Sequence, residues 1–257
     1  MGGTDFLLPA LVVCAATGCV TKEPAFIPLA SEMSQRITSS NVVIVATQKE
    51  LVADVDKSRV STATGGGLIP ALIDVAIESS RASSAEDNLR PIRNAIFDFE
   101  MGKELQQALG TRLDEVPWLH VKKTDVVYDK KAEQLGSLLA AGSEDVLVVI
   151  SPTYALSSDF SVLRVESQIR VVPRAAQFKS QEDAKADEGK VTPLYKKSVS
   201  YLSSLATFDP GSKEDAAKAW ASDGGVRIKE ALKQGVATVA TRIVDSLTHP
   251  VNSVAVP

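Results

Sequence analysis

The sequence has few of the residues that build metal, redox and base-stacking sites. Its 257 residues include two cysteines and two histidines, and aromatic residues make up 5% of the chain. His120 and His249 lie far apart in the sequence, and both cysteines fall within the first nineteen residues, so we expect no zinc site in the body of the protein. The scarcity of aromatic residues also disfavours a stacking platform for single-stranded nucleic acid.

The sequence has no surplus of positive charge either. Its net charge is −4, and its basic residues are scattered among acidic ones. A nucleic-acid-binding face normally needs a basic surplus, so we expect no nucleic-acid partner. Apolar residues at 44% and charged residues at 23% are ordinary for a globular protein, and a chain of this length can bury a sizeable core.

The amino-terminal segment predicts export and lipid anchoring. Residues 6–18 form an apolar stretch that is shorter than the roughly 20 residues of a membrane-spanning helix but suits the hydrophobic region of a signal peptide. Ala16-Thr17-Gly18-Cys19 then resembles the lipobox of bacterial lipoproteins. That resemblance implies cleavage before Cys19 and a diacylglycerol on its thiol. It also implies the outer membrane, because Val20 stands where an aspartate typically retains a lipoprotein in the inner membrane.

Two other interpretations of the cysteines remain open at this point. In the first, the segment is a buried amino-terminal helix and Cys14 and Cys19 are inert core residues. In the second, the two cysteines form a disulfide, although a loop of that size inside an apolar run would constrain little. Cys14 does not fit a lipobox, because Val13 before it is too large for the position before the cleavage site.

The rest of the chain predicts an α/β domain with a mixed sheet, a three-layer-like arrangement, a long late antiparallel hairpin and a carboxy-terminal helix. Residues 159–174 alternate, with Leu163, Val165, Ile169 and Val171 on one face and Arg164, Glu166, Gln168 and Arg170 on the other. Ser84-Ala85-Glu86-Asp87 resembles a capping box that opens a helix. The expected strands are 41–47, 118–122, 145–151, 159–174 and 194–205, and the expected helices are 68–81, 84–109, 129–141, 212–222 and 225–247.

This order of elements resembles the periplasmic domain of the curli secretion lipoprotein, the lipoprotein activators of penicillin-binding proteins and the amino-terminal domain of the Tol-system propeller protein. The resemblance implies a compact binding or assembly module. It is one of topology without a diagnostic side-chain motif, so it transfers no functional residues. We expect a signal peptide over 1–18, a lipid-anchored tether over 19–39, the α/β domain over 40–248 and a tail over 249–257.

Motifs for catalysis are missing from the sequence. Gly65-Gly66-Gly67 precedes an apolar segment without the Lys-Ser/Thr of a phosphate-binding loop, and no G-x-S-x-G elbow occurs. We therefore predict no catalytic residue, no metal and no cofactor. An envelope hydrolase that depends on His120 is one alternative function. A subunit of an oligomeric outer-membrane secretion pore, with 159–205 as the membrane-inserting hairpin, is another.

The prediction for function is a periplasm-facing lipoprotein that acts as a non-catalytic binding or assembly factor in the bacterial cell envelope. Its expected partners are the membrane, through the lipid on Cys19, and an envelope protein or further copies of the same chain. Tyr195, Tyr201 and Trp220 are the candidate interaction surface, because aromatic residues are favoured at interface hot spots. Ordinary core packing is the alternative role for these three rings.

Overall fold

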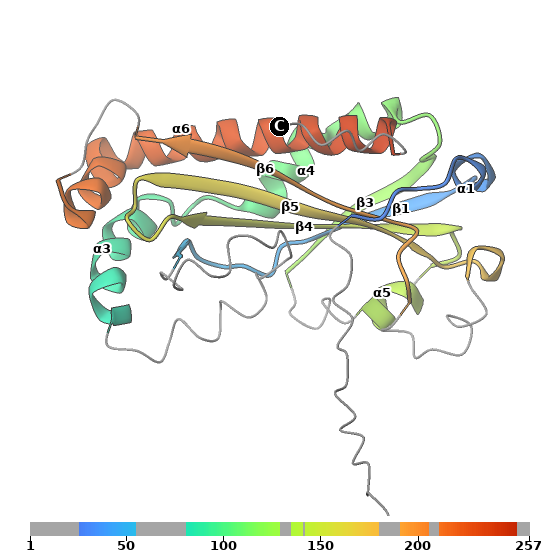
Figure 1. Ribbon diagram of the computed structural model, residues 1–257, viewed down its shortest axis with the longest axis horizontal. Coiled ribbons are helices and arrows are strands. Elements are labelled where there is room, and N and C mark those ends of the chain that lie inside the picture. Colours follow the sequence, from blue (N-terminus) through green and yellow to red (C-terminus); the bar gives the residue numbers. More distant parts are fainter. Residues whose placement is uncertain are drawn as a thin grey trace, which may run out of the picture.

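The computed structural model describes residues 26–54, 81–128, 135–140, 142–179, 191–205 and 211–250. They form an α/β fold built on one mixed sheet, in which strands follow the order β3-β1-β4-β5-β6 and β2 pairs with β4 (Figure 1). β1 is parallel to β3 and β4, whereas β5 is antiparallel to β4 and β6. The strands are β1 Ser40–Val45, β2 Val52–Ala53, β3 Val121–Val127, β4 Val146–Leu156, β5 Val162–Pro173 and β6 Tyr195–Ser204.

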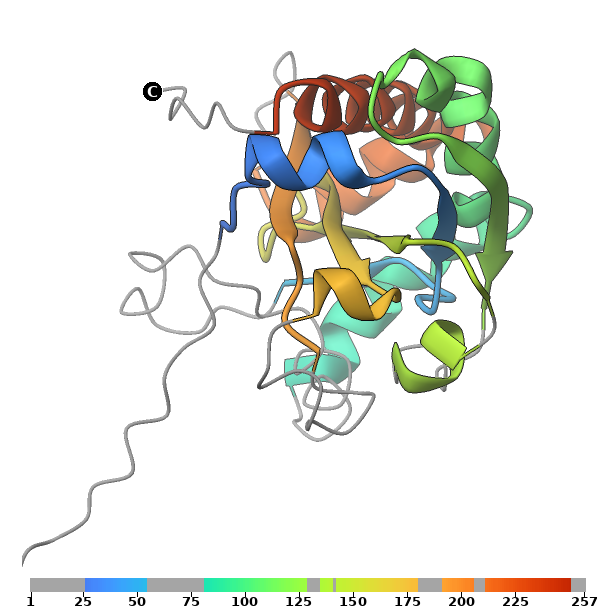
Figure 2. The same ribbon diagram turned by 90° about the vertical axis from the view of Figure 1, so that its right-hand side faces the viewer.

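Helices cover the two faces of the sheet unequally. α3, α4 and α6 lie over one face, and the much shorter α5 lies on the opposite side (Figures 1 and 2). The larger hydrophobic core therefore forms under α3, α4 and α6. The helices are α1 Ser31–Arg36, α3 Arg81–Ala95, α4 Met101–Leu109, α5 Leu135–Ala140 and α6 Lys213–Thr248, with 3₁₀ turns η1 Gly110–Glu115 and η3 Ala176–Phe178.

The position of β4 in the centre of the sheet explains why its first five residues, 146–150, are continuously apolar. Val148 and Ile150 point into the core under the helices, while Leu147 and Val149 pack with Val43 on the other face. A strand that is buried on both faces selects apolar residues at every position rather than at alternate ones. The prediction of a buried strand at 145–151 is confirmed, and the strand continues to Leu156.

The long late hairpin is also confirmed. β5 pairs with β6 over ten residue pairs, from Val162 with Ser204 to Val171 with Tyr195. The predicted alternation in β5 holds, because Leu163 and Val165 are fully buried under the helices. The polar row of β5 therefore faces the side of the sheet that α6 does not cover.

The carboxy-terminal helix forms as two segments, as the sequence predicts. Ser212 caps the first segment, and its hydroxyl accepts a hydrogen bond from the Asp215 N–H at 3.1 Å. The helix breaks at 222–225, where Asp223, Gly224 and Gly225 have positive φ. At Gly225 a side chain is excluded as well, because a Cβ there would lie 2.4 Å from the Cβ of Ala95.

Some expected boundaries are wrong. α3 begins at Arg81, so Ser84 lies inside the helix and does not cap it. The strand expected at 118–122 is β3, which begins at Val121, because Trp118 lies in a turn and His120 has a φ of 45°. The helix expected at 68–81 lies outside the described residues except for Arg81.

The expected boundary between tether and domain also needs correction. Leu29 and Ile37 are 0% and 1% exposed, and Ile27 forms a bridge to β6. Residues 26–39 therefore belong to the domain, because their apolar side chains fill its core. Among the helices of the described ranges, none is long and apolar enough to cross a membrane.

Candidate binding groove between strand β6 and helix α6

The candidate site begins with strand β6, which forms one edge of the sheet. The N–H and C=O of Lys196 both pair with Ile27, at 2.9 Å each, on the side away from β5. Backbone direction alternates along a strand, so every second residue after Lys196 also directs its N–H and C=O outward. These outward residues are Ser198, Ser200, Leu202 and Ser204. No other segment of the described chain pairs with this edge.

Ile27 shows that the edge accepts backbone pairing from another segment at one residue, Lys196. The bridge is antiparallel, and an edge-to-face contact supports it between the rings of Phe26 and Tyr195, 6.2 Å apart at 84°. At Lys196, pairing to the outer side of β6 therefore coexists with the pairing of β6 to β5. The available edge continues from Ser198 toward the opposite end of the strand.

Helix α6 forms the second wall of the groove. It runs alongside β6, as Figure 1 shows, and approaches the sheet closely at Gly235. A Cβ at Gly235 would lie 2.7 Å from Cγ2 of Val165 and 3.1 Å from Cδ1 of Tyr201. Glycine at this position lets the helix backbone lie against β5 and β6, so the strand edge and the polar side of the helix are neighbours.

Arg242 of α6 contacts the strand edge directly. Its guanidinium donates a hydrogen bond to the backbone carbonyl oxygen of Ser200. This contact occupies one outward acceptor of β6, and covering an edge with a group from a neighbouring helix opposes uncontrolled strand pairing. A partner that pairs along the full edge must share this acceptor with Arg242 or displace the side chain.

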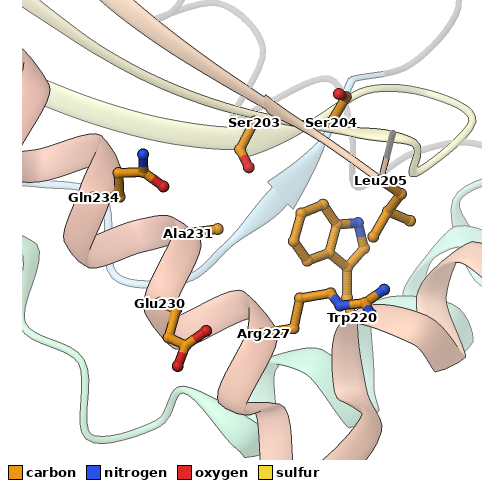
Figure 3. Close-up of a pocket in the computed structure, with 8 residues that line it drawn as sticks. All are labelled: Ser203, Ser204, Leu205, Trp220, Arg227, Glu230, Ala231 and Gln234. Carbon is orange, nitrogen blue, oxygen red and sulfur yellow. The ribbon is translucent and has the colours of Figure 1, made fainter. Parts of the chain in front are cut away.

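A pocket of about 240 Å³ lies at the far end of the groove (Figure 3). The indole of Trp220 is nearly fully buried there, and its N–H donates to the carbonyl oxygen of Phe160 at 2.7 Å. Figure 3 shows the Arg227 side chain next to Trp220, with Glu230 and Gln234 farther along the helix. The pocket is lined by the end of β6 and by α6. The lining residues are Ser203 and Ser204 of β6, Leu205 directly after it, and Trp220, Arg227, Glu230, Ala231 and Gln234 of α6.

The pocket offers a positively charged donor, a negatively charged acceptor and a neutral amide at the end of an open strand edge. Arg227 donates, Glu230 accepts, and the Gln234 amide does both. Such a set suits the polar end or side chains of an extended polypeptide whose backbone pairs with β6. The combination of a strand edge and a flanking helix is a recurrent way of binding peptides by strand addition.

A second polar surface lies on the sheet face opposite α6. Burial raises the pKa of Glu166 on β5, while the Arg164 guanidinium and a hydrogen bond from Ser198 oppose that rise. Thr153 of β4 and Ser200 of β6 lie directly beside Glu166 in the register. In the described parts of the chain, no group of three or more His, Cys, Asp or Glu residues is placed to hold a metal ion.

The structure places the three aromatic residues predicted as an interaction surface along the groove between β6 and α6, but little of their side chains is exposed. Tyr195 is fully buried and donates its hydroxyl to the Ser246 carbonyl at 3.1 Å, and Trp220 is 1% exposed. These two rings are core residues, which is the alternative that the sequence left open. Tyr201 is only partly buried and stays in the groove wall beside Gly235. Cys19 lies outside the described residues.

His120 has a structural contact in the turn before β3. Its side chain is exposed, and its backbone carbonyl accepts a hydrogen bond from the Ser40 N–H at 3.2 Å.

The sequence analysis did not single out the pocket residues Arg227, Glu230 and Gln234. Their spacing of three and four residues places them on one side of a helix, and that is the signal that could have grouped them.

Comparisons with known proteins place the chain in no family. No family profile matches it, and no curated protein matches it. Two solved structures align over most of its length, both PelC dodecamers from Paraburkholderia phytofirmans. One is a point variant with a TM-score of 0.26 and 6% identity, covering 84% of this chain and 91% of its own. The other has a TM-score of 0.25 and 8% identity, covering 85% and 90%. TM-scores this low do not establish a shared fold.

Proposed function

We propose that this protein is a lipoprotein of the bacterial cell envelope, anchored through Cys19 in the outer membrane and facing the periplasm, and that it acts as a non-catalytic binding or assembly factor. The lipobox-like Ala16-Thr17-Gly18-Cys19 supports the anchor. The groove between β6 and α6 supports the binding role. The partner is an extended segment of another envelope polypeptide or of a second copy of this chain.

One observation carries the binding role: Ile27 already pairs with the edge of β6 through two backbone hydrogen bonds of 2.9 Å. Backbone pairing supplies affinity in strand addition, and pockets for side chains supply specificity. The outward residues from Ser198 to Ser204 provide the first component. The Trp220 pocket, at the end of the same edge, provides the second.

The test uses a substitution that removes one outward donor. Leu202→Pro deletes the outward N–H of β6, whereas Leu202→Ala keeps that N–H and shortens the side chain. The tagged, lipidated protein is used to capture partners from envelope extract, and the captured proteins are quantified for the wild type and both variants. We expect Leu202→Pro to lose capture and Leu202→Ala to retain most of it. Equal capture by both variants would reject the groove as the binding surface.

The anchor is tested separately with Cys19→Ala. The wild type should incorporate labelled acyl chains and float with membranes, while Cys19→Ala should do neither. Accumulation of unprocessed wild type, together with membrane-bound Cys19→Ala, would reject the lipoprotein assignment. Sedimentation velocity of the wild type and Leu202→Pro then distinguishes self-association through β6 from binding to a different protein.

A further inference from the structure

The open edge of β6 is limited at both ends. At one end Ile27 already pairs with Lys196, and at the other end the strand stops at Ser204. A strand that adds to this edge without displacing Ile27 therefore has to pair within positions 198–204. The residues that direct their N–H and C=O outward there are Ser198, Ser200, Leu202 and Ser204.

This stretch can pair with itself in a second copy of the chain. Two identical strands that pair antiparallel about a two-fold axis bring residue i opposite j and j opposite i. With the axis at Tyr201, Ser198 faces Ser204 of the second copy, and Ser200 faces Leu202. All four outward residues are then paired, and each pair exchanges two N–H···O hydrogen bonds.

The limits of the edge select this register. An axis at Ser200 would place Ser204 opposite Lys196, which Ile27 occupies. An axis at Leu202 would place Ser198 opposite position 206, beyond the end of β6. The axis at Tyr201 therefore uses the open edge completely and leaves the pairing of Ile27 intact.

Large side chains lie at this axis on both faces of the sheet. On the α6 side, Tyr201 would face Tyr201 of the second copy as a pair without mutual hydrogen bonds, with the two Cα atoms about 4.5 Å apart. On the other face, Leu202 is 59% exposed. It would be a diagonal neighbour of Leu202 of the second copy, at about 7–8 Å, which long side chains bridge. The pairing would thus cover one of the large apolar side chains that the described chain leaves exposed.

Helix α6 is placed to pack against its own copy about the same axis. A side chain at Gly235 would touch Val165 of β5 and Tyr201 of β6, so an axis at Tyr201 passes α6 close to Gly235 and Val236. Because α6 runs alongside β6 (Figure 1), the two helices would be antiparallel to each other. Neighbouring strands are about 4.8 Å apart, so helices that each lie over β5 and β6 would be separated by about 10 Å, the spacing of packed helices.

The charges on α6 complement those of a second copy in this arrangement. Arg227 lies nine positions before Val236, and Asp245 lies nine positions after it. The two residues are separated by about five helical turns, which places them on the same side of the helix. The two-fold axis brings Arg227 of each copy opposite Asp245 of the other. Both side chains are exposed, and no hydrogen bond or ion pair joins either of them to another part of the described chain.

Glu230 and Arg242 form a second complementary set, six positions before and after Val236. Glu230 lines the pocket at the end of β6 (Figure 3), and Arg242 donates to the Ser200 carbonyl oxygen in the single chain. When a second copy pairs at Ser200, the released Arg242 side chain can bind Glu230 of that copy. The group that covers the edge in one chain thereby gains a charged partner in the pair.

From these observations we infer that the occupant of the β6 edge is the β6 edge of a second copy, in a two-fold symmetric dimer whose sheet continues across both chains. The inference deepens the proposed binding role and rests on it, because it uses the same outward residues. The limits of the open edge, the exposed Leu202 and the opposite charges along α6 all indicate the same axis.

Exchange of charges on α6 tests the two-fold arrangement. Arg227→Asp leaves two negative groups on the groove side of α6, and Asp245→Arg leaves two positive ones, so each variant paired with itself has like charges facing each other twice. A mixture of the two variants restores both pairs of opposite charge. Sedimentation velocity of the full-length protein, in detergent with micelles in excess over protein chains, gives the dissociation constants. Lys233→Asp, on the side of α6 that faces Asp98, is the matched control.

We expect the wild type and Lys233→Asp to form dimers of equal affinity. Each of the two groove-side variants alone should dimerise about ten-fold more weakly, and their mixture should return to nearly the wild-type affinity. A monomeric wild type would overturn the inference. Single variants that dimerise as tightly as the wild type, or a mixture that associates no better than its components, would also overturn it.

A cysteine at the axis tests the register. Tyr201→Cys places the thiols of two copies on Cα atoms about 4.5 Å apart, a distance that a disulfide spans. Ser203→Cys is the control on the same face, because position 203 lies opposite Val199 of the second copy. We expect mild oxidation to link the two 201 positions and not the two 203 positions, as identified by mass spectrometry of the linked peptides. Equal linkage at both positions, or none at 201, would overturn the inference.

Failure of the second copy as the partner is distinguishable from failure of the binding role. A monomeric wild type whose capture of an envelope protein is lost in Leu202→Pro but kept in Leu202→Ala overturns the dimer and leaves the binding role standing. Equal capture by both variants, together with a dimer that Leu202→Pro does not weaken, rejects both.

Discussion

Replacement of Leu202 by proline tests the register and the openness of β6 in one experiment. If Leu202 directs its N–H outward, proline removes no hydrogen bond within the domain, because proline is tolerated on an edge strand when its nitrogen faces away from the neighbouring strand. The adjacent Ser203 pairs with Leu163 of β5 and directs its N–H inward. Ser203→Pro is therefore the matched control at which the same ring breaks the ladder.

The two substitutions should differ clearly in their effect on the free energy of unfolding. Leu202 is 59% exposed, and since a fully buried leucine contributes about 2 kcal/mol, its loss should cost at most about 1 kcal/mol. Part of that cost is offset because proline restricts the unfolded chain. Ser203→Pro leaves an unsatisfied acceptor and forces the strand apart, which should cost about 3 kcal/mol.

Urea unfolding followed by circular dichroism gives both free energies, with Leu202→Ala reporting the contribution of the side chain alone. Similar m-values in all variants would show that the compactness of the native state is unchanged. The assignment of outward residues fails if Leu202→Pro destabilises the protein as much as Ser203→Pro does. A stable Leu202→Pro protein that has lost partner capture would instead connect the open edge to binding.

Three further substitutions test other parts of the fold. Gly235→Ala should gain about 1 kcal/mol in helix propensity, but its Cβ would lie 2.7 Å from Cγ2 of Val165. We therefore expect the free energy of unfolding in urea to fall by about 1 kcal/mol. A net rise would contradict the close approach of α6 to the sheet. Hydrogen bonds from Thr38 lower the pKa of Asp145. The contribution of Asp145 to the free energy of unfolding is therefore fully present above the ordinary carboxyl pKa and is lost as pH falls through the lowered pKa. In urea unfolding at a series of pH values, Asp145→Asn should abolish this loss of stability at acid pH. Burial raises the pKa of Glu166, so stability declines as pH rises through its titration; Glu166→Gln should be the more stable form above that range and equal to wild type below it.

The elements that the sequence predicted well are those whose burial leaves a local pattern. The first five residues of β4, 146–150, are buried on both faces and continuously apolar, and β5 alternates because only one of its faces packs under helices. The break in α6 was predictable from the pair Gly224 and Gly225. In each case, adjacent residues carry the information, so no knowledge of distant contacts was needed.

The features that the sequence did not reveal depend on contacts between distant segments. Ile27 belongs to the domain because it pairs with Lys196, 169 positions later, and no pattern in the residues around Ile27 predicts that pairing. The groove likewise depends on distant segments, because α6 approaches Tyr201 of β6 closely at Gly235. Trp220 is of a residue type common at interface hot spots, yet its indole N–H donates a hydrogen bond to the Phe160 carbonyl inside the core.

The contrast between the two edges of the sheet is a physical reason to regard β6 as the binding edge. Natural proteins protect an exposed edge with charged residues, which oppose pairing with another strand. β3, the opposite edge, carries Lys122, Lys123 and Asp125, the last two joined by a 2.9 Å ion pair. β6 carries Lys196 and Lys197 at the end where Ile27 already pairs, and its outward residues beyond them are three serines and one leucine, so its own charges do not extend along the open part of the edge. Within the described residues, two charged side chains contact this stretch, Glu166 through the Ser198 side chain and Arg242 through the Ser200 carbonyl oxygen. Of these two, Arg242 occupies a backbone group of the edge, so a strand that pairs at Ser200 has to share that acceptor or displace the guanidinium.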